Sequence, residues 1–347
     1  MKIVIAPDSF KESLSAMAVA TCIEKGFAQI FPDSEYIKVP LADGGEGTVD
    51  VLVDALNGER QSQHVHGPIL GNVNAVWALL DDGNTKTALI EIAAASGLDL
   101  ITPEQRNPLI ATSYGTGQSI LQALDAGAKK IIIGLGGSAT NDGGAGILQA
   151  LGGQLLDAQG NELPVGGSEL ANLAAIDLTN LDKRCADTEL IVACDVSNPL
   201  TGENGASAIF GPQKGATPEM VEQLDKALAH FADVAEDILG VNHQQSAGYG
   251  AAGGAPMGLS LAFDVQIQAG IDMVLDTLKV NDALEGADLV ITGEGQMDNQ
   301  TLNGKTPFGI AKRALARNIP IIAIAGSLGT EVEALYDTIG SIFGTVL

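Results

Sequence analysis

Short apolar runs of strand length recur along this chain, and several of them end in loops rich in glycine and acidic residues. Residues 2–6 run into Pro7-Asp8-Ser9-Phe10-Lys11, and residues 288–292 run into Gly293-Glu294-Gly295. Stretches with helical periodicity separate the runs, which is the pattern of βα units around a parallel sheet. Such sheets bind ligands in the loops at the carboxyl ends of their strands. The sequence therefore predicts an α/β fold whose glycine loops carry the function.

The two ends of the chain predict one sheet. Strands are expected near residues 2–6, 35–40, 288–293, 319–326 and 341–346. Helices are expected at about 15–30, with Ser15 as N-cap, at 48–57 and at 305–318. Two early and three late strands of this kind would make a flavodoxin-like doubly wound parallel sheet.

The middle of the chain has a different pattern. Possible antiparallel strands at 72–80 and 87–93 precede strands at 130–135 and 189–194 and a long helix at 217–239. We interpret this part as a second α/β domain inserted into the first. The predicted division is 1–65 and 285–347 for the flavodoxin-like domain and 66–284 for the inserted domain, with the site in the cleft between them.

Charge and composition exclude several classes of function. The chain has 347 residues, a net charge of −25 and only 18 Lys and Arg, so we expect neither a nucleic-acid nor a membrane partner. Its three cysteines form no CxxC pair, and its four histidines show no zinc-site spacing. No signal peptide or membrane-length apolar run is apparent, and a reducing cytoplasm is the expected location.

The glycine loops favour an anionic ligand. Glycine lets backbone N–H groups approach a phosphate closely, and Lys11, Lys214 and Lys305 lie in or beside such loops. A lysine there can neutralise charge that builds during phosphoryl transfer, although each could equally be a solvated surface residue. Residues 299–306 half-match the Walker A pattern but lack its first glycine, so we reject a P-loop.

Acidic residues in the loops suggest a metal ion and a base. Gly293-Glu294-Gly295 and Asp43-Gly44-Gly45-Glu46 are predicted at carboxyl ends of strands, where carboxylates can hold a divalent cation against nucleotide phosphates. The alternative is that these acids only cap turns and helices. Asp195 ends the strand at 190–194 and is a candidate base for a substrate hydroxyl, or else caps the turn through Asn198-Pro199.

One loop supports a different function. Gly134-Leu135-Gly136-Gly137-Ser138-Ala139 fits the dinucleotide pattern GxGxx(G/A), with Asp157 at about the right distance. A nicotinamide-dependent oxidoreductase is therefore an alternative, as is a non-catalytic protein that binds an anionic metabolite. However, Asn141-Asp142-Gly143-Gly144 continues the loop where a helix should begin, which favours a phosphate- or hydroxyl-binding loop.

Taken together, the loops resemble those of the glycerate kinase type 1 family, microbial kinases that phosphorylate D-glycerate with ATP. The matching segments span nearly the whole chain: 6–11, 42–48, 112–117, 136–144, 194–200, 211–215 and 292–298. The resemblance implies a flavodoxin-like domain with an inserted α/β domain. Two features depart from the family pattern: Glu12 stands where a glycine is expected, and the chain ends at Leu347, where a closing helix is expected.

The resemblance and the loops together predict ATP- and Mg²⁺-dependent phosphorylation of D-glycerate to 2-phosphoglycerate by in-line transfer. Asp195 is the expected proton acceptor, with Lys11 and Lys214 as the other catalytic candidates. The expected substrate and nucleotide contacts are Asp8, Ser9, Gly44, Gly45, Gly136, Gly137, Ser138, Asn141, Gly293, Gly295 and Lys305. The candidate metal ligands are Asp43, Glu46, Asp142, Glu294 and Asp298.

Overall fold

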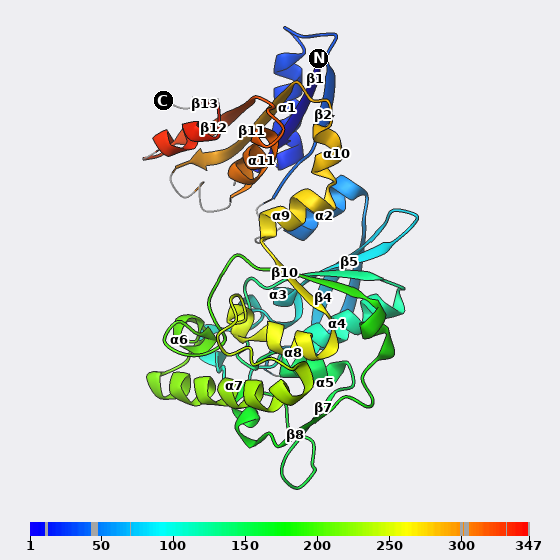
Figure 1. The fold of residues 1–347 in the computed structure, drawn as a ribbon, viewed down its shortest axis with the longest axis vertical. Coiled ribbons are helices and arrows are strands. Elements are labelled where there is room, and N and C mark those ends of the chain that lie inside the picture. The colour runs from blue at the N-terminus through cyan, green and yellow to red at the C-terminus, as the bar shows by residue number, and fades with distance from the viewer. Residues whose placement is uncertain are drawn as a thin grey trace. The chain divides into compact units, whose positions relative to one another are not determined.

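The chain forms two compact units in a computed structural model that describes residues 1–10, 13–42, 48–69, 71–298, 301, 305–330 and 332–345. Unit 1 consists of Met1–Gly58 and Ala269–Leu347, and unit 2 consists of Glu59–Gln268 (Figure 1). Unit 2 thus interrupts unit 1 in the sequence. Among the described residues, none of the helices has the length and apolar character needed to cross a membrane.

Unit 1 is built on a five-stranded sheet in which all neighbouring strands are parallel. Its spatial order is β13 (Ser341–Gly344), β12 (Ile321–Leu328), β11 (Leu289–Met297), β1 (Lys2–Pro7) and β2 (Glu35–Lys38). Numbered along unit 1, this order is 2-1-3-4-5, which is that of flavodoxin. The predicted flavodoxin-like sheet is confirmed.

Helices cover both faces of this sheet. Helix α1 (Ala16–Phe27) begins after Ser15, whose side chain accepts a hydrogen bond from the Ala18 N–H at 3.3 Å. Its apolar stripe packs in one core cluster with Ile3, Ile5 and Ile291. The intervening Val4 is also fully buried, so the opposite face of β1 is covered as well. The described residues of unit 1 also form α2 (Thr48–Leu56), α9 (Gly270–Thr277), α10 (Val280–Leu284), α11 (Thr306–Leu315) and the 3₁₀ turn η8 (Val332–Asp337).

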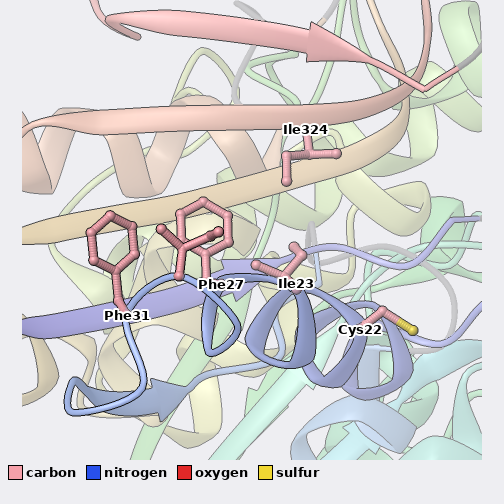
Figure 2. A pocket seen from close by; sticks show the side chains of 7 residues that line it. Cys22, Ile23, Phe27, Phe31 and Ile324 are labelled. Carbon is pink, nitrogen blue, oxygen red and sulfur yellow. The ribbon is translucent and has the colours of Figure 1, made fainter.

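An apolar cavity of about 420 Å³ lies between α1 and β12. Figure 2 shows Ile23, Phe27 and Phe31 from the α1 side and Ile324 from β12 around it, with Cys22 at one end. Because no charged side chain lines it, this cavity does not suit a phosphate or a carboxylate ligand.

Unit 2 contains a six-stranded mixed sheet. Its spatial order is β10 (Val265–Gln268), β9 (Glu189–Ala193), β6 (Lys130–Gly134), β5 (Lys86–Glu91), β4 (Asn72–Asp81) and β3 (Glu59–His66). The first four strands are parallel, whereas β4 pairs antiparallel with both β5 and β3. The antiparallel pair predicted at 72–80 and 87–93 is therefore present. A separate antiparallel hairpin joins β7 (Gln154–Leu156) to β8 (Ala175–Asp177).

The longest helix of the described residues, α7 (Pro218–Leu239), matches the helix predicted at 217–239. The Thr217 side chain accepts a hydrogen bond from the Met220 N–H at 3.3 Å, and Gly240 ends the helix with a φ of +71°. Phe231 anchors its buried face in the core of unit 2. The other helices and 3₁₀ turns of unit 2 are α3 (Ile92–Ser96), η1 (Leu98–Leu100), η2 (Pro103–Gln105), α4 (Tyr114–Asp125), α5 (Ala145–Ala150), η3 (Gly167–Asn172), η4 (Lys183–Asp187), α6 (Ala206–Phe210), η5 (Pro212–Lys214), η6 (Ala251–Gly253) and α8 (Ala255–Ala262).

A glycine-rich segment, residues 247–258, packs against the glycine loop (residues 135–144) that follows β6. The Gly143 N–H donates to the Gly253 carbonyl at 2.9 Å, and the Gly258 N–H donates to the Gly143 carbonyl at 2.8 Å. Gly253 has a φ of +69°, and a Cβ there would lie 2.0 Å from the Thr140 carbonyl oxygen. Glycine is therefore required at 253 both for the backbone conformation and for the close approach of two main chains.

We predict that Gly253→Ala destabilises the protein by at least about 3 kcal/mol, because it adds a backbone clash to the strain of a positive φ. Gly160→Ala is the matched control, since Gly160 has a φ of +82° but no atom within 4 Å of the added Cβ. The control should lose only about 1 kcal/mol. Urea unfolding of both variants measures the difference, and equal losses would contradict the packing argument.

Candidate active site

Two predicted loops of unit 2 leave the same edge of its sheet. Strands β6 and β9 are parallel neighbours, and their last residues, Gly134 and Ala193, stand side by side. The glycine loop (residues 135–144) follows β6, and the loop that carries Asp195 follows β9. Asp195 is exposed, so its carboxylate is accessible from solvent. The expected base and the glycine loop therefore lie at one ligand-binding edge of a parallel sheet.

The glycine loop is exposed at its start and buried at its end. Gly136 and Gly137 are exposed, whereas Ser138, Asn141 and Asp142 are buried. Gly137 has a φ of +72°, a conformation that favours glycine. Exposed glycines can present backbone N–H groups to a ligand, while the buried polar side chains must find partners inside the protein.

Asp142 organises the buried end of the loop. Its Oδ2 accepts hydrogen bonds from the Ser113 N–H and Oγ–H, both at 2.8 Å, and from the Gly146 N–H at 3.3 Å. Its Oδ1 accepts from the Gly144 N–H at 3.2 Å. Burial raises the pKa of this carboxyl, and these hydrogen bonds oppose the rise. Because both oxygens already serve N–H and O–H donors, the arrangement favours a role in ordering the loop over metal binding.

Lys214 is the buried cation of the glycine loop. Its side chain is 2% exposed, and its Nζ donates to Ser138 Oγ at 2.9 Å and to the Thr140 carbonyl at 2.7 Å. Burial lowers the pKa of its ammonium to about 7, and the Asp142 carboxylate acts in the opposite direction. The structure thus brings together Lys214, Ser138, Asn141 and Asp142, four residues singled out from the sequence.

The predicted loops of unit 1 also meet at one sheet edge. Strands β1 and β11 are parallel neighbours with Pro7 beside Gly293, and the strand order reverses between them. This is the switch point at which doubly wound sheets bind ligands. The Asp8 N–H donates to the Gly293 carbonyl at 2.8 Å, which ties the two loops together.

Carboxylates at this edge are held by hydroxyl groups. Asp8 accepts hydrogen bonds from the Ser9 N–H and from Thr306 Oγ, both at 2.6 Å. Glu294 is 8% exposed and accepts from Thr301 Oγ at 2.7 Å. Burial raises the pKa of Glu294 to about 7; the Thr301 hydrogen bond and Lys305 lower it, and Asp8 and Asp298 raise it. Asp8, Glu294, Asp298 and Lys305 are therefore electrostatically coupled, as expected of one site.

Part of the predicted site cannot be described. Lys11, Asp43, Gly44, Gly45 and Glu46 lie outside the described residues. Within the described ranges, no three His, Cys, Asp or Glu side chains are grouped so as to hold a metal ion. The described residues therefore provide no complete metal site, and we derive no chemical step through one.

Three residues whose hydroxyl groups hold these carboxylates were not predicted from the sequence. Ser113 holds Asp142, Thr301 holds Glu294 and Thr306 holds Asp8. Ser113 lies in the segment 112–117 that resembles the family, so that segment was the available signal. The two threonines lie within the Walker A half-match at 299–306, and rejecting that half-match left no reason to choose them.

The geometry around Asp157 does not support the nicotinamide alternative. Asp157 Oδ1 accepts from the Gln159 and Asn161 N–H groups, both at 2.8 Å, in a turn after β7. Strand β7 pairs with β8 and is not part of the parallel sheet. The helix after the glycine loop begins only at Ala145, well beyond Ala139. A dinucleotide-binding fold would place the acidic residue after a strand of the parallel sheet and would begin its helix directly at the glycine motif. Neither feature is found here.

The family model for the glycerate kinase family matches residues 3–346. This chain belongs to that family. It is 57% identical over 337 residues to a glycerate kinase from Haemophilus influenzae, which covers 97% of this chain and 89% of the relative. It is 52% identical over 336 residues to the glycerate 2-kinase of Escherichia coli K12, covering 97% of this chain and 88% of the relative.

A solved structure agrees with this assignment. A crystal structure from Salmonella typhimurium LT2, described as a candidate glycerate kinase 2, is 53% identical and superposes with a TM-score of 0.89. The match covers 99% of this chain and 90% of that one. The chain is therefore a kinase of mixed α/β fold, as the sequence predicted.

We predict that Lys214 makes stability rise with pH between about pH 7 and pH 10. Its pKa in the folded protein is about 7, below its ordinary value, so in this range the unfolded chain binds a proton that the folded protein does not. The unfolding free energy of the wild type should therefore increase with pH relative to that of Lys214→Met. Urea unfolding of both proteins at about pH 6.5, 8 and 9.5 measures this difference. A constant difference would show that Lys214 stays charged in the folded protein.

Proposed function

We propose that this glycerate kinase transfers the γ-phosphoryl group of ATP to the 2-hydroxyl of D-glycerate. The observation that carries the proposal is the extent of the similarity. The relatives named glycerate kinase and glycerate 2-kinase match 97% of the chain, which includes both units and both loop edges. Identity of 52–57% over this length is similarity beyond a shared fold, and fold alone does not imply function.

The chemistry of the loops supports phosphoryl transfer. The 2-hydroxyl oxygen would attack the γ-phosphorus, the bond from phosphorus to the β,γ-bridging oxygen would break, and the hydroxyl proton would pass to Asp195. Exposed N–H groups at Gly136 and Gly137 are suited to an anionic ligand. Lys214 would contribute positive charge beneath the same loop, because its Nζ contacts Ser138 and Thr140.

Mg²⁺ would enter with the nucleotide phosphates. Glu294 and Asp298 are the described candidates, since both lie in the coupled group at the β11 edge, together with Asp43 and Glu46 outside the described residues. The three cysteines are free thiols, which fits the reducing cytoplasm that we propose as the location.

The test of this function is ADP release from ATP and Mg²⁺ with D-glycerate, L-glycerate or no acceptor, followed by phosphorus NMR of the product. We expect turnover with D-glycerate and a phosphorus signal coupled to the single proton on carbon 2. Coupling to the two protons on carbon 3 would show phosphorylation of the other hydroxyl. Absence of turnover with D-glycerate in a folded protein would refute the proposed function.

The role of Asp195 has its own test. We predict that Asp195→Asn lowers kcat by about 10²- to 10⁴-fold, because the variant keeps the size of the side chain but cannot accept the proton. Asp187→Asn is the matched control, since Asp187 is exposed at the end of η4, two residues before β9 begins, whereas Asp195 lies beyond the other end of that strand. Near wild-type kcat for Asp195→Asn would mean that another group accepts the proton.

A further inference from the structure

The buried end of the glycine loop contains polar atoms that the protein does not satisfy. Thr140 and Asn141 are both fully buried. Within the described part of the chain, Thr140 Oγ1 and Asn141 Oδ1 have no hydrogen-bond partner. Buried polar groups are nearly always paired, because leaving one without a partner costs its full desolvation energy. Two such atoms on adjacent residues of a ligand loop indicate a polar ligand.

The loop is held so that these atoms cannot easily turn elsewhere. Asn141 Nδ2 donates to Ser207 Oγ at 3.0 Å, which directs the amide and leaves its oxygen without a partner. A Cβ at Gly253 would lie 2.5 Å from Asn141 Cα, and one at Gly167 would lie 2.3 Å from the Asn141 carbonyl oxygen. The main chain of the loop is thus closely packed against two glycines, which limits how far Thr140 and Asn141 can shift.

A buried lysine stands beside the same residues. Lys214 Nζ donates to the Thr140 carbonyl at 2.7 Å and to Ser138 Oγ at 2.9 Å. A bound carboxylate would favour the protonated form of this lysine, whose ammonium has three N–H donors, so these two contacts would leave one for the ligand. Lys214 and Ser207 belong to one short segment, α6 to η5, and both contact the loop at 138–141.

These groups define the chemistry of the ligand. Lys214 and the Thr140 hydroxyl can donate to a carboxylate, and Asn141 Oδ1 needs a donor such as a hydroxyl group. A small hydroxy acid carries both. Such a compact anion suits the buried residues below Gly136 and Gly137 better than a nucleotide, which needs room for its base and ribose.

We propose that Thr140, Asn141 and Lys214 bind the hydroxy acid substrate: the carboxylate contacts Thr140 and Lys214, and the hydroxyl that is not phosphorylated contacts Asn141. This assignment rests on the proposed function for the identity of the acid. It adds Thr140 to the candidate site and gives Asn141 and Lys214 specific roles. In D-glycerate, Asn141 Oδ1 would accept a hydrogen bond from the hydroxyl on carbon 3.

The first test is Thr140→Val, which replaces the hydroxyl by a methyl group of similar size. Because Thr140 Oγ1 has no partner in the protein, the change removes no internal hydrogen bond and should not lower Tm. We expect KM for D-glycerate to rise by about 10- to 100-fold, the effect of one hydrogen bond to a charged group, with KM for ATP unchanged. An unchanged KM for D-glycerate would overturn the role of Thr140.

Thr188→Val is the matched control. Thr188 is also buried, but its Oγ donates to the Arg184 carbonyl at 2.7 Å. This variant should lower Tm and leave KM for D-glycerate unchanged. If KM for D-glycerate rose only in Thr188→Val, KM would follow stability and not the Thr140 hydroxyl, and the proposal would be overturned.

The second test uses a ligand that lacks the hydroxyl on carbon 3. Calorimetry without ATP compares D-glycerate with D-lactate on the wild type and on Asn141→Ala. We expect the wild type to prefer D-glycerate by at least about 10-fold and Asn141→Ala to bind both acids equally. If Asn141→Ala still prefers D-glycerate, Asn141 does not bind the hydroxyl on carbon 3, and a buried water is the partner of Asn141 Oδ1.

The two proposals fail separately. If the wild type phosphorylates D-glycerate but Thr140→Val and Asn141→Ala keep the wild-type KM, the binding assignment fails and the proposed function stands. If calorimetry shows D-glycerate binding that depends on Thr140 and Asn141 but no phosphoryl transfer follows, the binding assignment stands and the proposed function fails.

Discussion

The candidate site of unit 2 depends on one buried carboxylate. Asp142 has no contact with solvent and satisfies its charge through Ser113, Gly144 and Gly146. Those hydrogen bonds join the glycine loop to the start of α4 and to the first turn of α5. A buried charge is costly unless such donors surround it, so the hydrogen bonds to Asp142 favour one conformation of the loop.

Parallel strands explain why the functional residues gather. In each unit, two neighbouring parallel strands end side by side, β6 with β9 and β1 with β11. Loops that are distant in the sequence, such as those of Asp8 and Glu294, therefore meet at one edge. Burial is the main cause of the raised pKa of Glu294. The Asp8 carboxylate, which the pairing of β1 with β11 brings to this edge, raises that pKa further.

Much of this fold could be read from local patterns. The apolar runs located β1, β6, β9, β11 and β12, and Ser15 marked the start of its helix by capping. The role of residues 250–258 could not be read in this way, because a glycine-rich segment looks the same whether it binds a ligand or packs against another main chain. Lys214 was expected to meet phosphate, and the structure adds that its Nζ is buried against Ser138 and Thr140. Sequence shows that a lysine is near a loop but not which way its side chain turns.

Local periodicity and glycine spacing were enough to determine the α/β class, because both are read from residues close together in the chain. The order of the strands and motifs along the whole chain indicated the flavodoxin-like sheet and the kinase family. Only the tertiary structure decided which side chains share a site. Ser113 meets Asp142 across 29 positions and Lys214 meets Ser138 across 76. Whether the Thr140 and Asn141 side chains find partners also depends on segments far away in the sequence. Hydrogen bonding and burial are properties of the packed chain, so no local pattern specifies them.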